Sequence, residues 1–254
     1  MELLESQAER VALVVGPGDL GAAAAFALSF AGANMAIAGR SRERTRALVG
    51  AIEAEGGRAT PFVIDVTDPE SVDAAFDDVS KAFGGLDVLV NAFGTNVRHP
   101  AEDISVEDWD RVIDTNLRGV FLCAKAAYRL MVPQRRGRII NVASAAGHAA
   151  RAWPATSAYG ASKAGVVQLT RFLAVEWATS GVTVNAVSPG YFLTRLTAKL
   201  AEWPVDRDRL LALTPMARFG ELHEFVGPVL FLASDASSFV TGHALVVDGG
   251  RVAI

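Results

Sequence analysis

The feature that most limits the possible folds of this chain is its alternation of short apolar runs with longer segments of helical periodicity. The apolar runs have the length of strands and lie near 10–15, 34–38, 59–64, 86–90, 137–142, 182–187 and 244–247. Helices are expected between them, starting near Leu20, Ser41, Asp68-Pro69, Ser105, Thr156 and Glu221. Such alternation predicts a parallel sheet with helices on both faces. We therefore expect an α/β fold with a doubly wound parallel sheet of about seven strands.

Length and composition fit one domain of this kind. The chain has 254 residues, of which 51% are hydrophobic and 20% are charged, and single α/β domains of about 200–250 residues are common. The sequence contains no repeat or linker, so residues 1–254 are predicted to form a single domain. Residues 195–213 fit none of the strand and helix units. We expect them to form a helical insert that acts as a lid.

The charge balance and the single cysteine limit the possible partners. A net charge of −4 argues against nucleic acid or an anionic membrane as the partner. No apolar run approaches the ~20 residues of a membrane helix, and the acidic residues 1–5 lack the apolar core of a signal peptide. Cys123 cannot form an internal disulfide, which favours a reducing compartment. We expect a cytoplasmic protein that acts on a small molecule.

A tyrosine and a lysine stand one helical turn apart, at Tyr159 and Lys163. Side chains at these positions leave the same helix face, so the lysine charge can favour the ionised form of a phenol that otherwise titrates near ~10. Alone, the spacing fits an exposed pair without function equally well. Ser144 adds context, because it follows the strand-like run 137–142, and ligands bind at the carboxyl ends of parallel strands.

Asn116 is the fourth residue of this candidate catalytic group. It lies within a segment whose apolar residues recur with helical period. An asparagine inside a helix competes with the backbone for hydrogen bonds, so its presence indicates a structural or catalytic task. Together, the candidate catalytic residues are Asn116, Ser144, Tyr159 and Lys163.

These residues resemble the short-chain dehydrogenase/reductase family, and the resemblance extends over nearly the full chain. Residues 188–194 are similar to the family's loop after its sixth strand, and Val247-Asp248-Gly249-Gly250 is similar to the end of its last strand. The resemblance implies a Rossmann-like fold. It also implies that the tyrosine donates and accepts the proton and that the serine holds the substrate oxygen. The lysine would clamp the cofactor ribose and shift the phenol pKa, and the asparagine would seat a relay water.

A glycine-rich turn after the first strand indicates a dinucleotide site. Residues 16–21 read Gly-x-Gly-x-x-Gly, whereas the resembled family usually has Thr-Gly-x-x-x-Gly-x-Gly. The turn opens a helix, the context in which it binds pyrophosphate at the helix amino end, and the predicted contacts are Gly16, Gly18, Leu20 and Gly21. Pro17 removes an amide donor and Asp19 adds a carboxylate, so weaker binding is expected. A tight turn without a ligand is the alternative.

The end of the second strand bears on the choice between NADP and NAD. An NAD site would carry an acid there to hold the ribose hydroxyls, but Gly39 is followed by Arg40 and Ser41. Cations are disfavoured at a helix amino end, so a 2′-phosphate ligand would explain Arg40 and Arg42. NADP(H) is therefore the favoured cofactor and NAD(H) remains possible. The alternative is a solvated basic helix start.

The resemblance extends the predicted cofactor site along the sheet edge. It implies an adenine contact at Asp65 and Val66, and further contacts at Asn91, Gly94, Pro189, Gly190 and Thr194, besides Tyr159 and Lys163. We assign no metal ligands.

The predicted substrate pocket is polar, cationic and aromatic. Besides Ser144 and Tyr159, the loops after the fourth, fifth and sixth strands contribute Arg98, His148, Arg151 and Tyr191. Such a lining suits a polyhydroxylated or carboxylated substrate, although single arginines and histidines are often solvated surface groups. Within the family, residues 94–98, 189–194 and 214–220 look most like gluconate 5-dehydrogenases and related sugar-acid enzymes.

The sequence is therefore compatible with three functions and favours one assembly. The leading function is an NAD(P)-dependent oxidoreductase of a sugar acid or polyol. The alternatives are a reductase of a 3-oxoacyl or apolar ketone substrate and a non-catalytic ligand-binding protein. Family members commonly pair two helices across a dyad, which implies a homotetramer. The apolar residues expected on those helices are Phe121, Tyr128, Val167, Phe172 and Trp177, with ordinary core contacts as the alternative.

Overall fold

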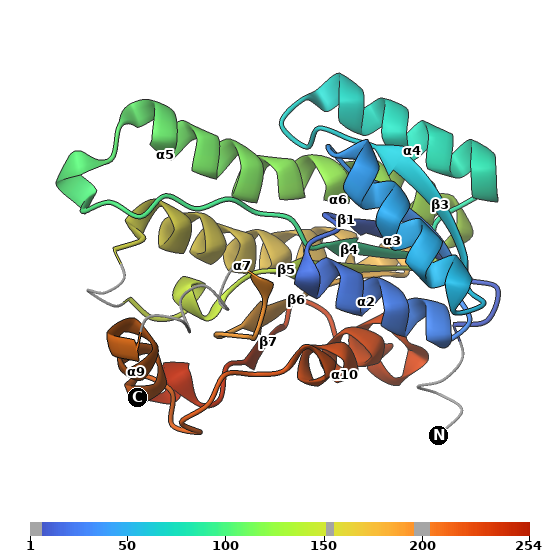
Figure 1. The fold of residues 1–254 in the computed structure, drawn as a ribbon. Coiled ribbons are helices and arrows are strands. Elements are labelled where there is room, and N and C mark those ends of the chain that lie inside the picture. Colours follow the sequence, from blue (N-terminus) through green and yellow to red (C-terminus); the bar gives the residue numbers. More distant parts are fainter. Residues whose placement is uncertain (1–6, 151–154, 196–203) are drawn as a thin grey trace.

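The computed structural model describes residues 7–150, 155–195 and 204–254, and its centre is a parallel sheet (Figure 1). Seven strands follow the order β3-β2-β1-β4-β5-β6-β7. They are β1 Val11–Val15, β2 Asn34–Gly39, β3 Arg58–Val63, β4 Val88–Asn91, β5 Gly137–Val142, β6 Val182–Pro189 and β7 Ala244–Val247. Every neighbouring pair is parallel. The predicted fold class is confirmed.

Helices cover both faces of the sheet (Figure 1). One face carries α2 Asp19–Phe30, α3 Arg42–Ala54 and α10 Leu222–Ala233. The other carries α4 Pro69–Phe83, α6 Gly119–Met131 and α7 Ser157–Trp177, with α5 Val106–Ile113 beside α7. In the expected insert, α9 Pro204–Ala212 is a helix, whereas 196–203 lie outside the described residues.

The helix starts are set by local hydrogen bonds of the kind expected from the sequence. The Ser41 hydroxyl accepts a bond of 3.3 Å from the Arg44 amide, and the Ser105 hydroxyl accepts one of 3.1 Å from the Asp108 amide. Asp68 caps α4 through a bond of 3.1 Å from the Glu70 amide. These caps fix the first residues of α3, α4 and α5, which follow β2, β3 and β4 in the chain.

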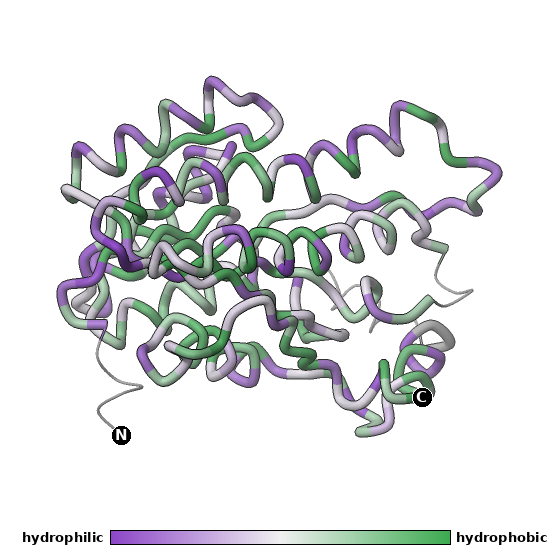
Figure 2. Tube along the Cα trace, turned by 180° about the vertical axis from the view of Figure 1, so that it is seen from behind, coloured by the Kyte–Doolittle hydropathy of each residue, from purple (hydrophilic) through white to green (hydrophobic). Residues whose placement is uncertain are grey.

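The core explains why the strands read as continuous apolar runs. All five residues of β1 are buried, with Leu13 and Val15 facing α4 and α6 and with Ala12 and Val14 facing α2 and α10. A strand covered on both faces must be apolar at every position. Figure 2 shows the corresponding hydrophobic trace through the middle of the molecule.

The long helical segment before β5 is interrupted by a π-helical turn. This turn spans Asp114–Arg118, between α5 and α6, and it contains Asn116. The sequence predicted an unbroken helical pattern here, which is correct except for the one wide turn. Such π turns are rare and often occur at functional sites.

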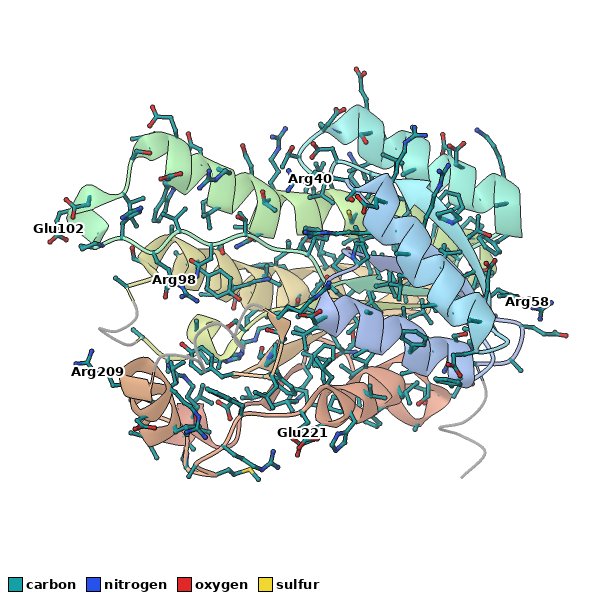
Figure 3. The ribbon with its side chains drawn as sticks, viewed as in Figure 1. Arg40, Arg58, Arg98, Glu102, Arg209 and Glu221 are labelled. Atoms are coloured by element: carbon teal, nitrogen blue, oxygen red, sulfur yellow. The ribbon has the colours of Figure 1, made fainter. Side chains whose placement is uncertain are left out.

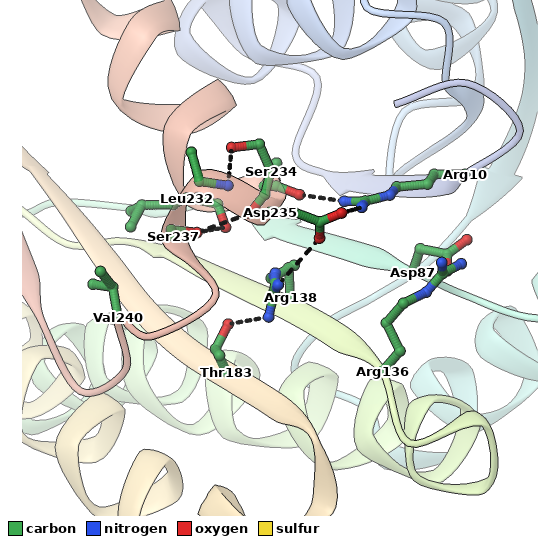
Figure 4. A network of polar contacts seen from close by, with 12 residues as sticks. Arg10, Asp87, Arg136, Arg138, Thr183, Leu232, Ser234, Asp235, Ser237 and Val240 are labelled. Atoms are coloured by element: carbon green, nitrogen blue, oxygen red, sulfur yellow. Dashed lines mark hydrogen bonds and ion pairs between the residues drawn. The ribbon is translucent and has the colours of Figure 1, made fainter. Parts of the chain in front are cut away.

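A polar network lies at the amino ends of the strands (Figure 4). The carboxylate of Asp235 accepts from Arg10 Nη2 at 2.7 Å and from Arg138 Nη2 at 3.3 Å, and both arginines are 8% exposed. Beside them, Arg136 pairs with Asp87, which also accepts from the Val11 amide at 2.8 Å. The network ties β1, β4 and β5 to the end of α10.

Among the described residues, no helix combines the length and the hydrophobicity needed to cross a membrane.

Candidate active site

The candidate site lies where the strand order reverses, at the carboxyl ends of β1 and β4. In open parallel sheets, ligands bind in the crevice at this point. The loops after β1, β4, β5 and β6 all reach this edge, because parallel strands end on the same side. Most of the residues predicted to contact cofactor and substrate lie in or beside these loops.

Asn116 holds the loop after β4 against α7. The side chain is fully buried, and its Nδ2 donates to the Thr95 carbonyl at 2.8 Å and to Ser162 Oγ at 3.0 Å. Its Oδ1 accepts from the Thr95 amide at 2.7 Å. Ser162 Oγ in turn donates to the Tyr159 carbonyl at 2.7 Å. Sequence reasoning missed Ser162, although its place three residues after Tyr159 on the same helix was a usable signal.

Lys163 is buried behind Tyr159 and bonded to the sheet. Its Nζ donates to the Val142 carbonyl at 2.7 Å and lies 5.8 Å from the centre of the Tyr159 ring. Burial lowers the pKa of Lys163 to about 8. A Cβ atom at Gly94 would lie 3.5 Å from this Nζ and 3.2 Å from Asn116 Oδ1. The glycine therefore leaves space in front of both side chains.

The Ser144 hydroxyl lies near enough to the Tyr159 phenol to lower its pKa. Ser144 is 9% exposed at the end of β5, and its Oγ accepts from the Ala146 amide at 3.2 Å. Burial raises the pKa of Tyr159, while Ser144 opposes the rise. The spacing to Lys163 predicts a lowered pKa, and the pKa of Tyr159 is raised instead, because desolvation outweighs the interaction with Ser144.

The glycine turn has the shape needed for close approach of a phosphate group. Gly16 has a φ of 98°, and a Cβ at Gly21 would lie 2.0 Å from the Gly16 carbonyl oxygen. Gly18 is the N-cap of α2 and has no side chain to occupy the helix amino end. Backbone amides at such an end bind pyrophosphate. These observations fit a dinucleotide.

Pro17 gives a physical reason for the missing acid at the end of β2. A Cβ at Gly39 would lie 2.7 Å from Pro17 Cδ, so the proline ring occupies the place of a side chain there. The next residue, Arg40, is exposed near the amino end of α3 (Figure 3). Its charge helps to lower the pKa of Asp65, after the hydrogen bonds from Thr67.

The remaining predicted cofactor residues divide into surface and buried groups. Ser41 uses its hydroxyl to cap α3, and Val66 contacts the helix at Gly119. Pro189 is buried at the end of β6, whereas Leu20, Gly190 and Thr194 are partly exposed. Asn91 is fully buried and its Nδ2 donates to Asn141 Oδ1 at 3.0 Å. The side chain of Asn91 thus joins β4 to β5, and the expected cofactor contact of this residue stays a prediction.

Tyr191, a predicted substrate residue, lies near enough to Tyr159 to affect its pKa. Its phenol raises the pKa of Tyr159, and its own pKa is raised by burial and lowered by Arg251 and Arg98. Arg251 Cζ lies 4.6 Å from the centre of the Tyr191 ring, and the residue is 8% exposed. Arg251 was not predicted, because only the folded chain brings its last residues back to β6.

His148 lies beside the end of β6. Its Nε2 lies 2.8 Å from Oγ of Ser188, a fully buried residue of β6. Burial lowers the pKa of His148, so its neutral form is favoured. The contact with Ser188 gives the ring a structural partner. Arg151, the other cation expected in this loop, lies outside the described residues.

Comparisons with known proteins agree with this geometry. The profile of a family described as enoyl-(acyl carrier protein) reductase matches residues 18–251. A gluconate 5-dehydrogenase of Gluconobacter oxydans (strain 621H) is 38% identical over 240 residues, which cover 94% of this chain and 93% of that protein. A cis-4-hydroxycyclohexanecarboxylate dehydrogenase of Sinomonas cyclohexanicum is 44% identical over 253 residues, 98% of this chain and 99% of that protein.

A solved structure of similar shape is a gluconate 5-dehydrogenase from Burkholderia cenocepacia J2315 in complex with NADP and tartrate. Its TM-score is 0.94 at 36% sequence identity, over 99% of this chain and 98% of that chain. Fold, site and comparisons together define an NAD(P)-dependent oxidoreductase. The chain belongs to the short-chain dehydrogenase/reductase family and acts on CH–OH or carbonyl groups.

Proposed function

We propose that this protein transfers hydride between NADP(H) and the carbonyl or secondary alcohol of a sugar acid or polyol. The observation that carries the reaction is the placement of the Tyr159 phenol between Ser144, which lowers the pKa of the phenol, and the buried Lys163, whose Nζ lies 5.8 Å from the ring centre. An acidic substrate is favoured by two cations, Arg98 and Arg251. Both lie near enough to Tyr191 for their positive charges to lower the pKa of its phenol. A carboxylate would be stabilised beside them.

The proposed mechanism divides the work among the four catalytic residues. When bound, the nicotinamide donates or accepts the hydride. Tyr159 gives a proton to the carbonyl oxygen in reduction, because its raised pKa keeps the phenol protonated. Ser144 donates a hydrogen bond to the same oxygen. Lys163 holds positive charge near the phenol and would bind the cofactor ribose, and Asn116 fixes the loop after β4 through Thr95.

The proposed cofactor contacts follow the edge of the sheet. The amides at the start of α2, after Gly16 and Gly18, would bind the pyrophosphate. Asp65 and Val66 would contact the adenine, and Thr194 the nicotinamide amide. Arg40 would bind the 2′-phosphate. The NADP in the Burkholderia cenocepacia structure supports this choice, although NAD(H) would also fit the remaining contacts.

Replacing Arg40 tests the cofactor preference. Arg40→Ala should weaken NADPH by about ten-fold and leave NADH unchanged, since a charge-assisted contact to phosphate contributes about 1.5–3 kcal/mol. Dissociation constants from fluorescence titration measure both effects. Arg46→Ala is the matched control, because Arg46 is exposed further along the same helix. Equal losses of affinity for NADPH and NADH would show that Arg40 does not bind the 2′-phosphate.

A substrate panel tests the proposed function itself. With NADP(H), kcat/KM should be highest for hydroxy acids such as gluconate and for their keto acids, compared with neutral polyols, acetoacetyl thioesters and apolar ketones. A 3-oxoacyl-[acyl-carrier-protein] reductase of Synechocystis is 40% identical over 246 residues, so thioesters are the main alternative. If kcat/KM for thioesters or apolar ketones exceeds that for hydroxy acids by an order of magnitude, the sugar-acid proposal is wrong. A failure to bind either cofactor would instead favour the non-catalytic alternative.

The exposed aromatic residues of α6 and α7 support a proposed homotetramer. Phe121 is 41% exposed and Phe172 is 59% exposed. Of the other three expected residues, Val167 is buried, and Tyr128 stacks on Trp177 with ring centres 4.1 Å apart. These three therefore contact the core, which was the alternative. Apolar faces that remain exposed favour closed symmetric assembly.

Light scattering should give about four times the chain mass of 26.8 kDa. Phe172→Asp should reduce the assembly, whereas Phe30→Asp, which alters a residue that is 69% exposed on α2, should not. A monomeric wild-type protein at micromolar concentration would refute the proposal.

A further inference from the structure

An ion pair joins the glycine turn to the loop after β6. Asp19, the first residue of α2, accepts two hydrogen bonds from Arg195. The backbone amide of Arg195 donates to Asp19 Oδ2 at 2.7 Å, and its Nε donates to Oδ1 at 2.7 Å. The Asp19 side chain is 18% exposed and that of Arg195 is 78% exposed. Both segments belong to the proposed cofactor site, since Arg195 directly follows Thr194.

This pair changes the expected effect of Asp19. The carboxylate lies in the first turn of α2, where the helix dipole stabilises a negative charge. The same end of the helix would bind the dinucleotide pyrophosphate, so an unpaired Asp19 would repel the ligand. Arg195 supplies the compensating charge. The departure of this glycine turn from the family pattern is therefore matched by a cation more than 170 residues away in the chain.

The backbone bond has a second consequence. It fixes the position of the Arg195 amide, and with it the end of the segment that contains Thr194, against the start of α2. The two halves of the dinucleotide, pyrophosphate and nicotinamide, would contact the two sides of this junction. The side-chain bond neutralises charge, and the backbone bond aligns the two loops.

We propose that Arg195 is a positioning residue for the dinucleotide, which neutralises Asp19 so that the glycine turn can accept a pyrophosphate. The proposal rests on dinucleotide binding as proposed above. It concerns the pyrophosphate and therefore predicts the same effect on NADPH and NADH. In this respect it differs from Arg40, whose proposed effect is confined to the 2′-phosphate.

Charge compensation predicts a particular pattern in a set of four variants. Arg195→Ala should weaken NADPH and NADH alike by about five-fold, because an exposed pair contributes modestly and the freed carboxylate repels the phosphates. Asp19→Asn should bind as tightly as the wild type or more tightly. The double variant Asp19→Asn with Arg195→Ala should recover to within about two-fold of the wild type. Arg195→Lys should retain most of the affinity.

Fluorescence titration of each variant with NADPH and NADH gives the dissociation constants, at low and at high salt. The loss in Arg195→Ala should shrink as salt rises, since the repulsion is screened. At saturating NADPH, kcat and the KM for the substrate should stay close to wild type, whereas the KM for NADPH rises. Arg129→Ala is the matched control, because it removes an arginine from an exposed ion pair with Asp73 on α4.

Two results would overturn the inference. Arg195→Ala binding both cofactors like the wild type would show that Asp19 needs no compensation. A double variant as weak as Arg195→Ala alone would show that the arginine acts other than by neutralising Asp19. Loss of NADPH binding by the wild-type protein would instead overturn the proposed function, so the two failures are distinguishable.

Discussion

Tyr159→Phe is expected to abolish measurable turnover in both directions. The substitution keeps the aromatic ring and removes the phenol hydroxyl. In the proposed mechanism this hydroxyl gives the proton to the carbonyl oxygen, and burial keeps it protonated. General acid catalysis by a positioned side chain contributes about 10²–10⁴ in rate, so kcat should fall by at least the lower value. Steady-state kinetics at saturating cofactor measure the loss.

Cofactor affinity and a control tyrosine separate chemistry from misfolding. The Tyr159→Phe variant should bind NADPH with a dissociation constant close to that of the wild type. Tyr128→Phe is the matched control, because Tyr128 stacks on Trp177 away from the sheet edge, and it should retain activity. Ser144→Ala should lose much of the rate, since a donor to the developing oxyanion is removed. Substantial turnover by Tyr159→Phe would refute the assignment.

The buried lysine gives the reaction an expected pH limit. Lys163 has its pKa lowered to about 8 by burial, so its charged form is present below that pH and is lost above it. The charge favours proton transfer at Tyr159 in our mechanism. For carbonyl reduction, kcat/KM should therefore fall above about pH 8. A profile that stays flat to pH 10 would show that the charge of Lys163 does not matter for this step.

The fold could be predicted from the sequence because its signals are local. A buried parallel strand must be apolar throughout, as β1 is, and helix starts depend on one capping side chain, as at Ser105. The candidate catalytic residues were found for a similar reason, since Tyr159 and Lys163 share one helix. These features need no knowledge of distant contacts.

Two of the features that sequence reasoning missed depend on contacts between distant segments. The pairing of Asp19 with Arg195 and the placement of Arg251 on Tyr191 exist only after the chain has folded. The pKa of Tyr159 was predicted with the wrong sign, because spacing reveals a neighbouring charge but not the cost of desolvation. The π turn around Asn116 is set by one extra residue, which helical periodicity does not resolve.

Among the variants that neutralise Asp19, Asp73 or Asp235, Asp235→Asn should produce the largest loss of stability. Asp235 receives hydrogen bonds from two arginines, Arg10 and Arg138, that are each 8% exposed (Figure 4). Breaking a buried ion pair leaves an unpaired charge and costs about 3–5 kcal/mol. The Asp235 side chain is 55% exposed, so solvent screening reduces the expected loss to about 1–3 kcal/mol. Urea denaturation measures this free energy of unfolding.

The pH dependence and a control pair test the cause of that loss. The pKa of Asp235 is lowered in the folded chain, first by its hydrogen bond with Arg10. Its stabilising effect is therefore fully present above the unfolded value near ~3.9 and disappears as pH falls through the lower folded value. The difference between wild type and Asp235→Asn should shrink accordingly below about pH 4. Asp73→Asn, which breaks the exposed pair with Arg129, should cost at most about 1 kcal/mol. Equal losses in the free energy of unfolding for the two variants would show that the burial of Arg10 and Arg138 does not strengthen the ion pairs of Asp235.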